Sequence, residues 1–123
     1  MAPDDGLGAG ERDALRRALV AERAATERRL ASLERTFAEL VDAADLEPPD
    51  DEHDPDGTTA YERAQVTSLA GEARTQLARI DRALADVDAP GFGACARCGR
   101  PIGAERLLAV PGTDRCVACA ALA

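Results

Sequence analysis

The sequence predicts a mainly α-helical protein, in which a long antiparallel coiled-coil hairpin is followed by a small module built around four cysteines. Two stretches repeat apolar residues at alternating steps of three and four, which is the spacing of a coiled-coil seam. A proline-containing acidic segment separates the stretches, and two C-x2-C pairs follow the second one. We therefore expect a flexible amino terminus at 1–10, a hairpin at 11–89 with an acidic tip at 46–57, and the cysteine module at 90–123.

The first long helix is expected over 11–45. Its strongest seam consists of Leu30, Leu33, Phe37, Leu40 and Ala44. Leu15 and Leu19 extend the stripe upstream, where Glu22 and Thr26 weaken it. Arginines and glutamates occupy the other faces, as is usual for a helix surface in water. This pattern predicts an amphipathic helix that pairs with a second one.

The two prolines at 48–49 end the first helix, because proline lacks an amide proton and disfavours helix in the residue before it. We expect the second helix to begin at Thr58 or Thr59, since Thr59 and Glu62 have the spacing of a capping box. Its seam consists of Val66, Leu69, Ala73, Leu77, Ile80, Leu84 and Val87. The Ala-Pro-Gly run at 89–91 stops it. Two matched seams joined by a short turn predict an antiparallel hairpin.

The formal net charge of −8 is concentrated in one segment. Eight acids lie between Asp42 and Asp56 with no arginine among them, and the other 15 acids equal the 15 arginines in number. Such a segment repels the phosphate backbone of nucleic acid, so we expect no direct DNA binding. It would attract a positively charged protein cavity or a metal ion. A solvated acidic loop, with His53 exposed to water, is an equal alternative.

The four cysteines form two pairs, Cys95 with Cys98 and Cys116 with Cys119. This spacing is typical of a four-thiolate zinc site, because each pair can present two sulfurs and two pairs complete a tetrahedron. No position is then open for water or substrate, so one structural Zn²⁺ is expected, and such ions contribute ~10–16 kcal/mol in small peptides. A pair of disulfides is the alternative, which a reducing cytosol disfavours. Oxidation that releases the metal is a further reading of the same thiols.

Apolar and basic residues surround the cysteines. The expected small core of the module consists of Ile102, Leu107, Leu108 and Val110, with Phe92 covering it. The nearby basic side chains are Arg97, Arg100, Arg106 and Arg115. We expect these arginines to offset the negative charge of the thiolates. The competing interpretation, a nucleic-acid patch, is disfavoured because no aromatic residue is interleaved for base stacking.

Composition limits the remaining possibilities. The 123 residues include no Trp, one Tyr and two Phe, so a large core is not expected. A small domain without such a core needs another source of stability, here the expected zinc ion. No apolar run approaches the ~18–20 residues of a membrane span, and the amino terminus does not have the pattern of a secretory signal. We therefore expect a cytoplasmic protein. The chain has a single histidine and no evident pairing of a nucleophile with a base, so we expect no enzyme activity.

The cysteine module resembles a known family. Residues 91–119 read GFGACARCGRPIGAERLLAVPGTDRCVAC, which resembles the zinc finger of the DksA/TraR family of bacterial transcription regulators. The positions that carry the resemblance, besides the cysteines, are Gly93, Gly99, Ile102, Arg106, Leu107, Ala109 and Pro111. The segment at 51–65, DEHDPDGTTAYERAQ, is similar to the tip and second-helix start of short relatives.

The resemblance implies a protein that binds RNA polymerase rather than DNA and inserts its hairpin into the secondary channel of that enzyme, often together with the nucleotide ppGpp. Acidic tip residues, here Asp51, Asp54 and Asp56, would approach the active centre. The tip motif D-x-x-D-x-A of well-studied members is not reproduced, because counting from Asp54 places Gly57 and Thr59 at its second aspartate and its alanine. The alternative functions are a coiled-coil adaptor and a redox- or zinc-responsive stress protein that does not act on RNA polymerase.

Overall fold

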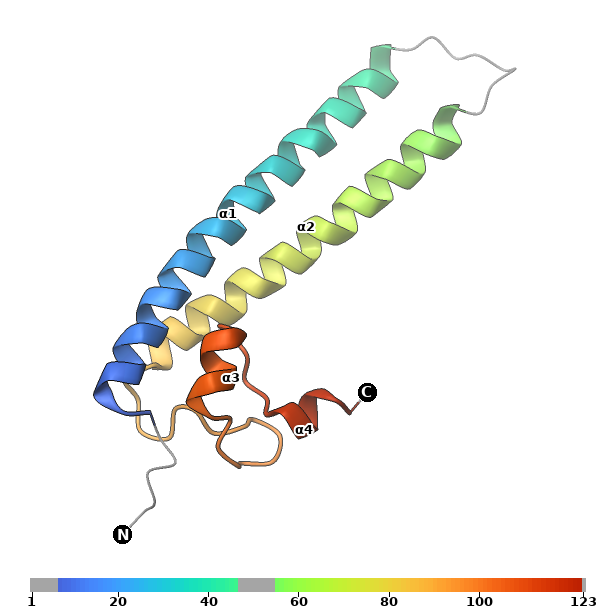
Figure 1. Ribbon diagram of the computed structural model, residues 1–123. Helices are drawn as coiled ribbons and strands as arrows, with labels where there is room; N and C mark the ends of the chain where they lie inside the picture. The colour runs from blue at the N-terminus through green and yellow to red at the C-terminus, as the bar shows by residue number, and fades with distance from the viewer. Residues whose placement is uncertain (1–6, 47–54, 123) are drawn as a thin grey trace. The chain divides into compact units, whose positions relative to one another are not determined.

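The computed structural model describes residues 7–46 and 55–122, and within these ranges all side chains except those at 45–46 and 55–58. It contains helices α1 (Ala9–Leu46), α2 (Pro55–Asp86), α3 (Ala104–Ala109) and α4 (Val117–Ala120) (Figure 1). Within these described ranges there is no β-strand, and a single isolated bridge pairs Ala94 with Pro101. The mainly helical class predicted from the sequence is confirmed.

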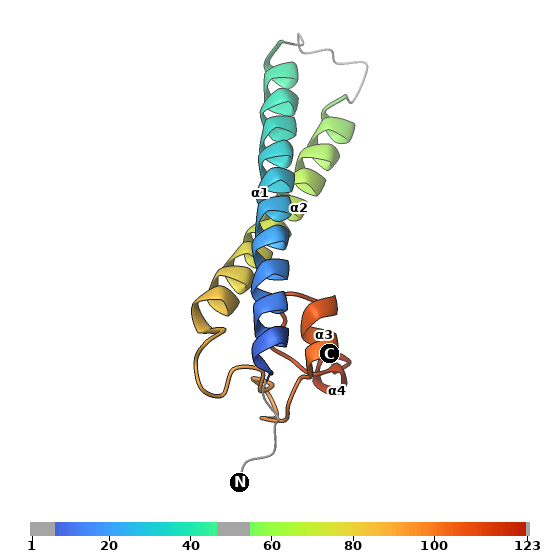
Figure 2. The ribbon, with the colours of Figure 1, turned by 60° about the vertical axis from the view of Figure 1, so that its left-hand side comes forward.

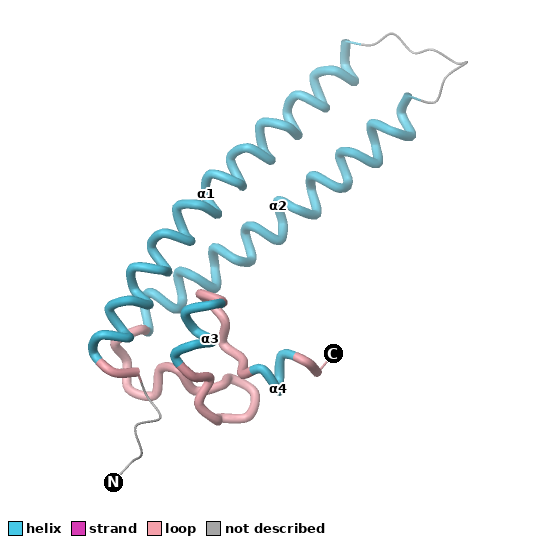
Figure 3. The backbone as a smooth tube through the Cα atoms, viewed as in Figure 1, coloured by secondary structure: helices cyan, strands magenta, loops and turns pink. Residues whose placement is uncertain are grey.

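The chain divides into two compact units. We call Met1–Ala24 with Gln76–Ala123 the cysteine unit, and Ala25–Thr75 the hairpin unit. In each unit a segment of α1 lies beside a segment of α2 (Figures 1 and 2). Loops at 87–103 and 110–116, drawn in pink in Figure 3, connect α2, α3 and α4 within the cysteine unit.

Ion pairs show that α1 and the end of α2 run antiparallel in the cysteine unit. Arg16 contacts Asp88 at 2.5 Å and Arg23 contacts Asp81 at 2.6 Å. The later of the two arginines contacts the earlier of the two aspartates, which is the order expected for antiparallel segments. In the hairpin unit Arg74 of α2 contacts Glu34 of α1 at 3.1 Å. All of these side chains are largely exposed, and such pairs contribute little to stability. They report the pairing of the helices, which confirms the predicted hairpin.

The core of the cysteine unit joins the two long helices to the cysteine module. Its fully buried members are Leu15, Leu19, Ile80, Val87 and Leu107. Phe92 and Ile102 pack against this cluster. Because Leu107 comes from α3, the module packs against the start of α1 and the end of α2.

The turn at 110–114 lies close against α2. Gly112 has φ +95°, and a Cβ at this position would lie 3.4 Å from Cγ1 of Ile80. Gln76 Nε2 donates a hydrogen bond of 3.1 Å to the carbonyl oxygen of Pro111. Glycine is required here by both the backbone conformation and the close approach. The turn thereby fixes the second half of the module onto α2.

The hairpin unit has a thinner core than the predicted seam implies. Among its described side chains, the buried ones are Thr26, Ala70 and Ala73, all of them small. Phe37 and Leu69, both predicted seam positions, are 39% and 43% exposed. Two helices without a third layer cannot enclose large side chains, so small residues become the buried ones. Thr26, the polar residue expected to weaken the stripe, lies in this thin core with its side chain 0% exposed.

The helix boundaries also differ in one place from the sequence prediction. α1 ends at Leu46, just before the two prolines, as expected. α2 begins at Pro55, so the capping box at Thr59 and Glu62 does not mark its start. Proline is well tolerated in the first helical turn, where its missing amide proton has no intrahelical partner. No helix in the described part of the chain is long and apolar enough to cross a bilayer.

Candidate metal centre

The first cysteine pair lies on a tight loop closed by backbone hydrogen bonds. Cys95 N–H donates to Arg100 O at 2.7 Å, and Gly99 N–H donates to Cys95 O at 2.9 Å. Gly99 has φ +78°, a conformation that residues with a Cβ rarely adopt. The loop therefore presents both sulfurs of the pair on one side, as the C-x2-C spacing predicts.

The second cysteine pair lies at the start of α4. Cys116 is the N-cap residue of this short helix, and its sulfur accepts a hydrogen bond of 3.5 Å from Cys119 N–H. Ala120 N–H donates to Cys116 O at 2.9 Å. The two loops are tied together by a bond from Ala96 N–H to Asp114 O at 2.7 Å. Both pairs are consequently held in one small framework.

The four sulfur atoms lie within 4.8 Å of one another. The Sγ atoms of Cys98 and Cys116 are 3.8 Å apart. Four Zn–S bonds of about 2.3 Å in a tetrahedron separate the sulfurs by about 3.8 Å, so the cluster needs little adjustment to bind one ion. An all-thiolate donor set favours zinc over the hard cations Mg²⁺ and Ca²⁺. The arrangement fits one structural zinc ion.

The four thiols differ in exposure. Cys95 and Cys119 are buried, at 3% and 6% exposed, whereas Cys98 is exposed and Cys116 is half-buried. Each C-x2-C pair thus contributes one inner and one outer sulfur. The site has a buried side and a side that faces solvent.

The pKa values of the thiols are also unequal. Backbone hydrogen bonding from Cys116, and then from Cys98, lowers the pKa of Cys95 to about 6. The backbone N–H of Cys119 lowers the pKa of Cys116. Burial, followed by its interactions with Cys116 and Cys98, raises the pKa of Cys119 to about 12. The framework therefore favours the thiolate at Cys95 and at Cys116, while a metal ion must displace the proton of Cys119.

The surroundings of the site correct part of the sequence prediction. Leu107, Ile102 and Phe92 pack into the core as expected. Leu108 and Val110 are 38% and 44% exposed, so their assignment to the core was wrong. The helix α3 has only six residues, and one face of so short a helix can contribute Leu107 alone to the buried cluster.

Two of the predicted basic residues, Arg106 and Arg115, line a cavity. Arg106 Nε donates to Arg115 O at 2.8 Å, and both residues line a cavity of about 600 Å³ in the cysteine unit. Arg79 and Arg82 of α2 line the same cavity, with Asp114 as its acidic residue. Sequence reasoning missed this convergence of four arginines. The spacing of Arg79 and Arg82, which places them on one face of a helix, was the available signal.

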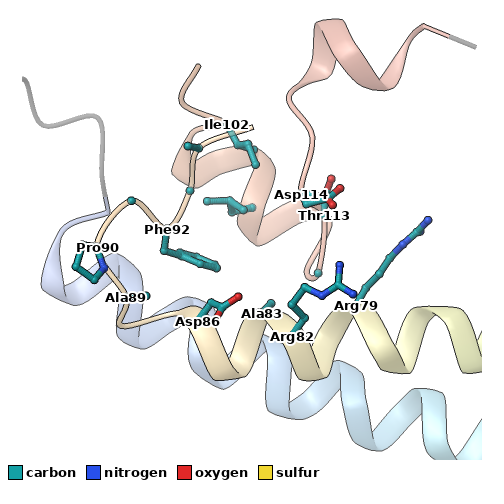
Figure 4. A pocket seen from close by; sticks show the side chains of 15 residues that line it. Arg79, Arg82, Ala83, Asp86, Ala89, Pro90, Phe92, Ile102, Thr113 and Asp114 are labelled. Atoms are coloured by element: carbon teal, nitrogen blue, oxygen red, sulfur yellow. The ribbon is translucent and has the colours of Figure 1, made fainter. Parts of the chain in front are cut away.

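A second cavity of about 260 Å³ lies beside the first. Phe92, Ile102 and Leu107 form its apolar part. Figure 4 shows the side chains of Phe92 and Ile102 in this lining. Arg82 extends from α2 toward Thr113 and Asp114 in the same view. The two cavities share Arg79 and Arg82, so these arginines are accessible from both.

The predicted tip residues are not placed by the structure. Asp51 and Asp54, together with His53, lie outside the described residues. Asp56 belongs to the first turn of α2, but its side chain is not described. Their roles stay predictions.

Comparison with known proteins matches the cysteine module to a family model and the fold to a solved structure. Residues 90–123 match the model of the family described as prokaryotic dksA/traR C4-type zinc finger. The structure is similar to that of transcription factor DksA2 from Pseudomonas aeruginosa, with a TM-score of 0.74 and 22% sequence identity. This similarity covers 98% of the chain and 88% of the Pseudomonas chain. It shows a shared fold.

A relative among curated proteins is uncharacterised. It comes from Aquifex aeolicus (strain VF5) and is 34% identical over 64 residues, which are 52% of this chain. The match spans 44% of that relative's own length.

Proposed function

We propose that this chain, whose residues 90–123 carry a zinc finger of the DksA/TraR type, is a transcription regulator that binds RNA polymerase directly. The observation that carries the proposal is the combination of this finger with a helical hairpin that matches the DksA2 fold over 98% of the chain. Neither part alone would suffice, since zinc fingers and helical hairpins serve many functions. We place its action in the cytoplasm and assign it no catalytic residues.

The zinc ion has a structural role in this proposal. Cys95, Cys98, Cys116 and Cys119 would be its ligands, and full thiolate ligation leaves no position for substrate. The ion would hold together the two loops that flank α3. Because Leu107 of α3 belongs to the core formed with Leu19 and Ile80, the ion would stabilise the end of the hairpin as well.

The acidic tip at 46–57 is the segment that we propose acts on RNA polymerase. The hairpin would enter the secondary channel of RNA polymerase, and Asp51, Asp54 and Asp56 would approach the active centre. The charge distribution supports this, since the segment between Asp42 and Asp56 accounts for the net charge of −8. A positively charged protein cavity would attract such a segment, whereas DNA repels it.

The four-arginine cavity is the proposed site for an anionic effector such as ppGpp. Arg79, Arg82, Arg106 and Arg115 line it, against Asp114. Arginine suits phosphate groups, because its planar donors can bind two oxygens at once. Labelled ppGpp should bind the complex with polymerase, and a variant with Arg79→Ala and Arg82→Ala should bind it less well. Alanine at Arg28 and Arg35, exposed arginines of α1, provides the matched control.

Site-specific cross-linking tests the main proposal. A photo-reactive amino acid at position 54 should cross-link to the catalytic subunits of core RNA polymerase at low salt, where attraction of the acidic turn is greatest. The same group at Glu72, an exposed position of α2 in the hairpin unit, reports whether cross-linking is specific to the turn. Absence of any binding to core polymerase at low salt would overturn the proposal.

Two sets of substitutions separate binding to RNA polymerase from the effect on transcription. Asp54→Asn with Asp56→Asn should leave folding and polymerase binding intact and reduce the effect on transcription. Glu62→Gln with Glu72→Gln removes the same amount of charge from exposed positions of α2 and should leave the effect in place. If both pairs act equally, net charge rather than the turn is responsible.

A coiled-coil adaptor is the second candidate, and one observation favours it. An apolar cavity of about 310 Å³ in the hairpin unit is lined by Leu33, Phe37, Val66 and Ala70, among others, and leaves Phe37 39% exposed. Such a surface could pair with another helix. Self-association that persists after the tip acids are replaced, and that Phe37→Ser abolishes, would support the adaptor. A chain that is monomeric at all concentrations tested would count against it.

A further inference from the structure

The cavity of about 260 Å³ in the cysteine unit has an apolar wall that is not fully covered by the protein. Phe92 and Ile102 line it and are only half-buried, whereas Leu107 belongs to the buried core. Apolar side chains that stay partly open in a concave place are typical of sites for small ligands. The question is then which polar groups share this cavity with them.

The opposite wall of the cavity carries two arginines and two aspartates. Arg79, Arg82 and Asp86 share one face of α2, because steps of three and four residues return to the same side of a helix. Asp114 comes from the turn of the module, and Figure 4 shows Arg82 extending toward it. This charged wall therefore has as many positive as negative side chains.

None of these four charged side chains forms an ion pair with another described residue. By contrast, Arg16, Arg23 and Arg74 each contact an acid on the opposite side of a helix pairing. Arg82 and Asp86 are unpaired even though they lie four residues apart on a helix, where opposite charges are neighbours. Both signs of charge are consequently available to a ligand in the cavity.

We propose that this cavity binds a free α-amino acid with an aromatic or large apolar side chain. Such a molecule carries a carboxylate and an ammonium group on one carbon atom, with an apolar group attached to the same carbon. Its carboxylate would accept hydrogen bonds from Arg82, whose planar donors suit two oxygens at once. Its ammonium group would donate to Asp86, and its side chain would pack against Phe92 and Ile102.

The size and charge of the cavity favour this class of ligand over others. A dry cavity of ~150 Å³ is enough for a benzene ring, so 260 Å³ has room for a ring together with the head group of an amino acid. A purely anionic ligand would place its charge near Asp86 and Asp114 without compensation, and a hydrocarbon would leave both signs of charge without a partner. Binding of this kind requires neither RNA polymerase nor ppGpp.

Nuclear magnetic resonance of the whole zinc-loaded chain, labelled with ¹⁵N, tests binding without any partner protein. Gly91, Gly93 and Gly112 line the cavity, and their amide signals should shift along one saturable curve as L-phenylalanine is added. Gly71, an exposed glycine of α2 in the hairpin unit, should not shift. Absence of shifts at the three lining glycines, or equal shifts at Gly71, would overturn the proposal.

Analogues of the ligand test each wall of the cavity on the unmodified chain. The ammonium group is missing from 3-phenylpropanoate, the carboxylate from 2-phenylethylamine, and the ring from L-alanine. Each should bind at least about tenfold more weakly than L-phenylalanine, because each leaves one set of groups in the cavity without its partner. Equal binding of any one of the three would show that the group it lacks is not recognised, and would overturn the proposal.

Two substitutions test the charged wall. Arg82→Gln and Asp86→Asn should each weaken the binding of L-phenylalanine about tenfold, because each removes one charge-assisted hydrogen bond. Both positions are exposed, so the melting temperature and the zinc content should not change. Arg35→Gln, at an exposed position of α1 in the hairpin unit, is the matched control and should leave the affinity unchanged. An equal weakening in Arg35→Gln, or none in Arg82→Gln, would contradict the assignment.

Discussion

At the scale of single residues, Thr26 is the clearest departure from an apolar seam. Its side chain is 0% exposed, and its hydroxyl has no hydrogen-bond partner among the described residues. A buried hydroxyl without a partner costs about 1–3 kcal/mol, whereas an apolar group of the same shape avoids that cost. We expect Thr26→Val to raise the free energy of unfolding by about 1 kcal/mol, measured by urea denaturation of the zinc-loaded protein.

Thr67 provides the control for this substitution. It lies in α2 of the same hairpin unit and is exposed, so Thr67→Val should leave the free energy of unfolding nearly unchanged. A loss of stability in Thr26→Val would contradict the assignment and would indicate that the hydroxyl is bonded. A gain in both variants would point instead to general differences between valine and threonine in a helix.

The unequal thiol pKa values predict how metal affinity depends on pH. With the pKa of Cys119 raised to about 12, its proton is still bound at neutral pH and must be displaced by zinc. The pKa of Cys95, lowered to about 6, leaves that group largely ionised at neutral pH, and it binds a competing proton as the pH falls through 6. We expect the apparent zinc affinity to rise about tenfold per pH unit for each proton displaced. Competition with a chelator between about pH 6 and pH 8 measures this slope, and a flat profile would contradict it.

The metal site shows what could be predicted from sequence at this scale. Two residues separate Cys95 from Cys98, so the chain itself brings them together, and their pairing with Cys116 and Cys119 follows from the requirement for four ligands. The convergence of Arg79 and Arg82 with Arg106 and Arg115 depends instead on how α2 packs against the module. Such tertiary contacts leave no local pattern in the sequence. Exposure of individual thiols is likewise a property of packing.

At the scale of elements, the periodicity located both long helices but not the burial along them. α1 and α2 follow the repeats closely, because a 3.6-residue period is a local property. The stripe at Leu30, Leu33 and Phe37 is the most regular part of α1, yet the leucines that are fully buried are Leu15 and Leu19. Burial is greatest where the cysteine module adds a third layer through Leu107. Periodicity cannot indicate which part of a seam acquires such a layer.

Two leucines of α1 test this distribution of the core. Leu19→Ala, at a position 0% exposed, should lower the free energy of unfolding by about 3 kcal/mol. Leu33→Ala, at a half-buried position of the same helix, should cost about 1 kcal/mol. The residue types are identical, so the comparison isolates burial. Equal costs, or a larger cost at Leu33, would contradict the structure and favour the seam expected from the sequence.

At the scale of the whole molecule, charge and metal fall in different parts of the sequence. The eight acids between Asp42 and Asp56 account for the net charge, and the cysteines follow more than thirty residues later. The four-arginine cavity belongs to the cysteine unit, in a chain that is acidic as a whole. By charge alone, the acidic segment would attract a positively charged partner and the four-arginine cavity would attract an anion. Substitutions in the acidic segment and in the cavity should therefore have separable effects.

Removal of zinc is the test of how far the metal stabilises the whole chain. α3 and α4 have six and four residues, against 38 and 32 in α1 and α2, so chelation should remove little of the far-ultraviolet helical signal. The melting temperature should nevertheless fall by more than about 10 °C, because the ion stabilises the folded state alone and its loss frees Leu107 from the core shared with Leu19 and Ile80. Cys95→Ser should reproduce this fall, whereas Ser at the exposed Ala96 should not. Thermal melting followed by circular dichroism, with metal content measured in parallel, distinguishes these outcomes. An unchanged melting temperature in zinc-free protein would mean that α1 and α2 support the cysteine unit without the metal.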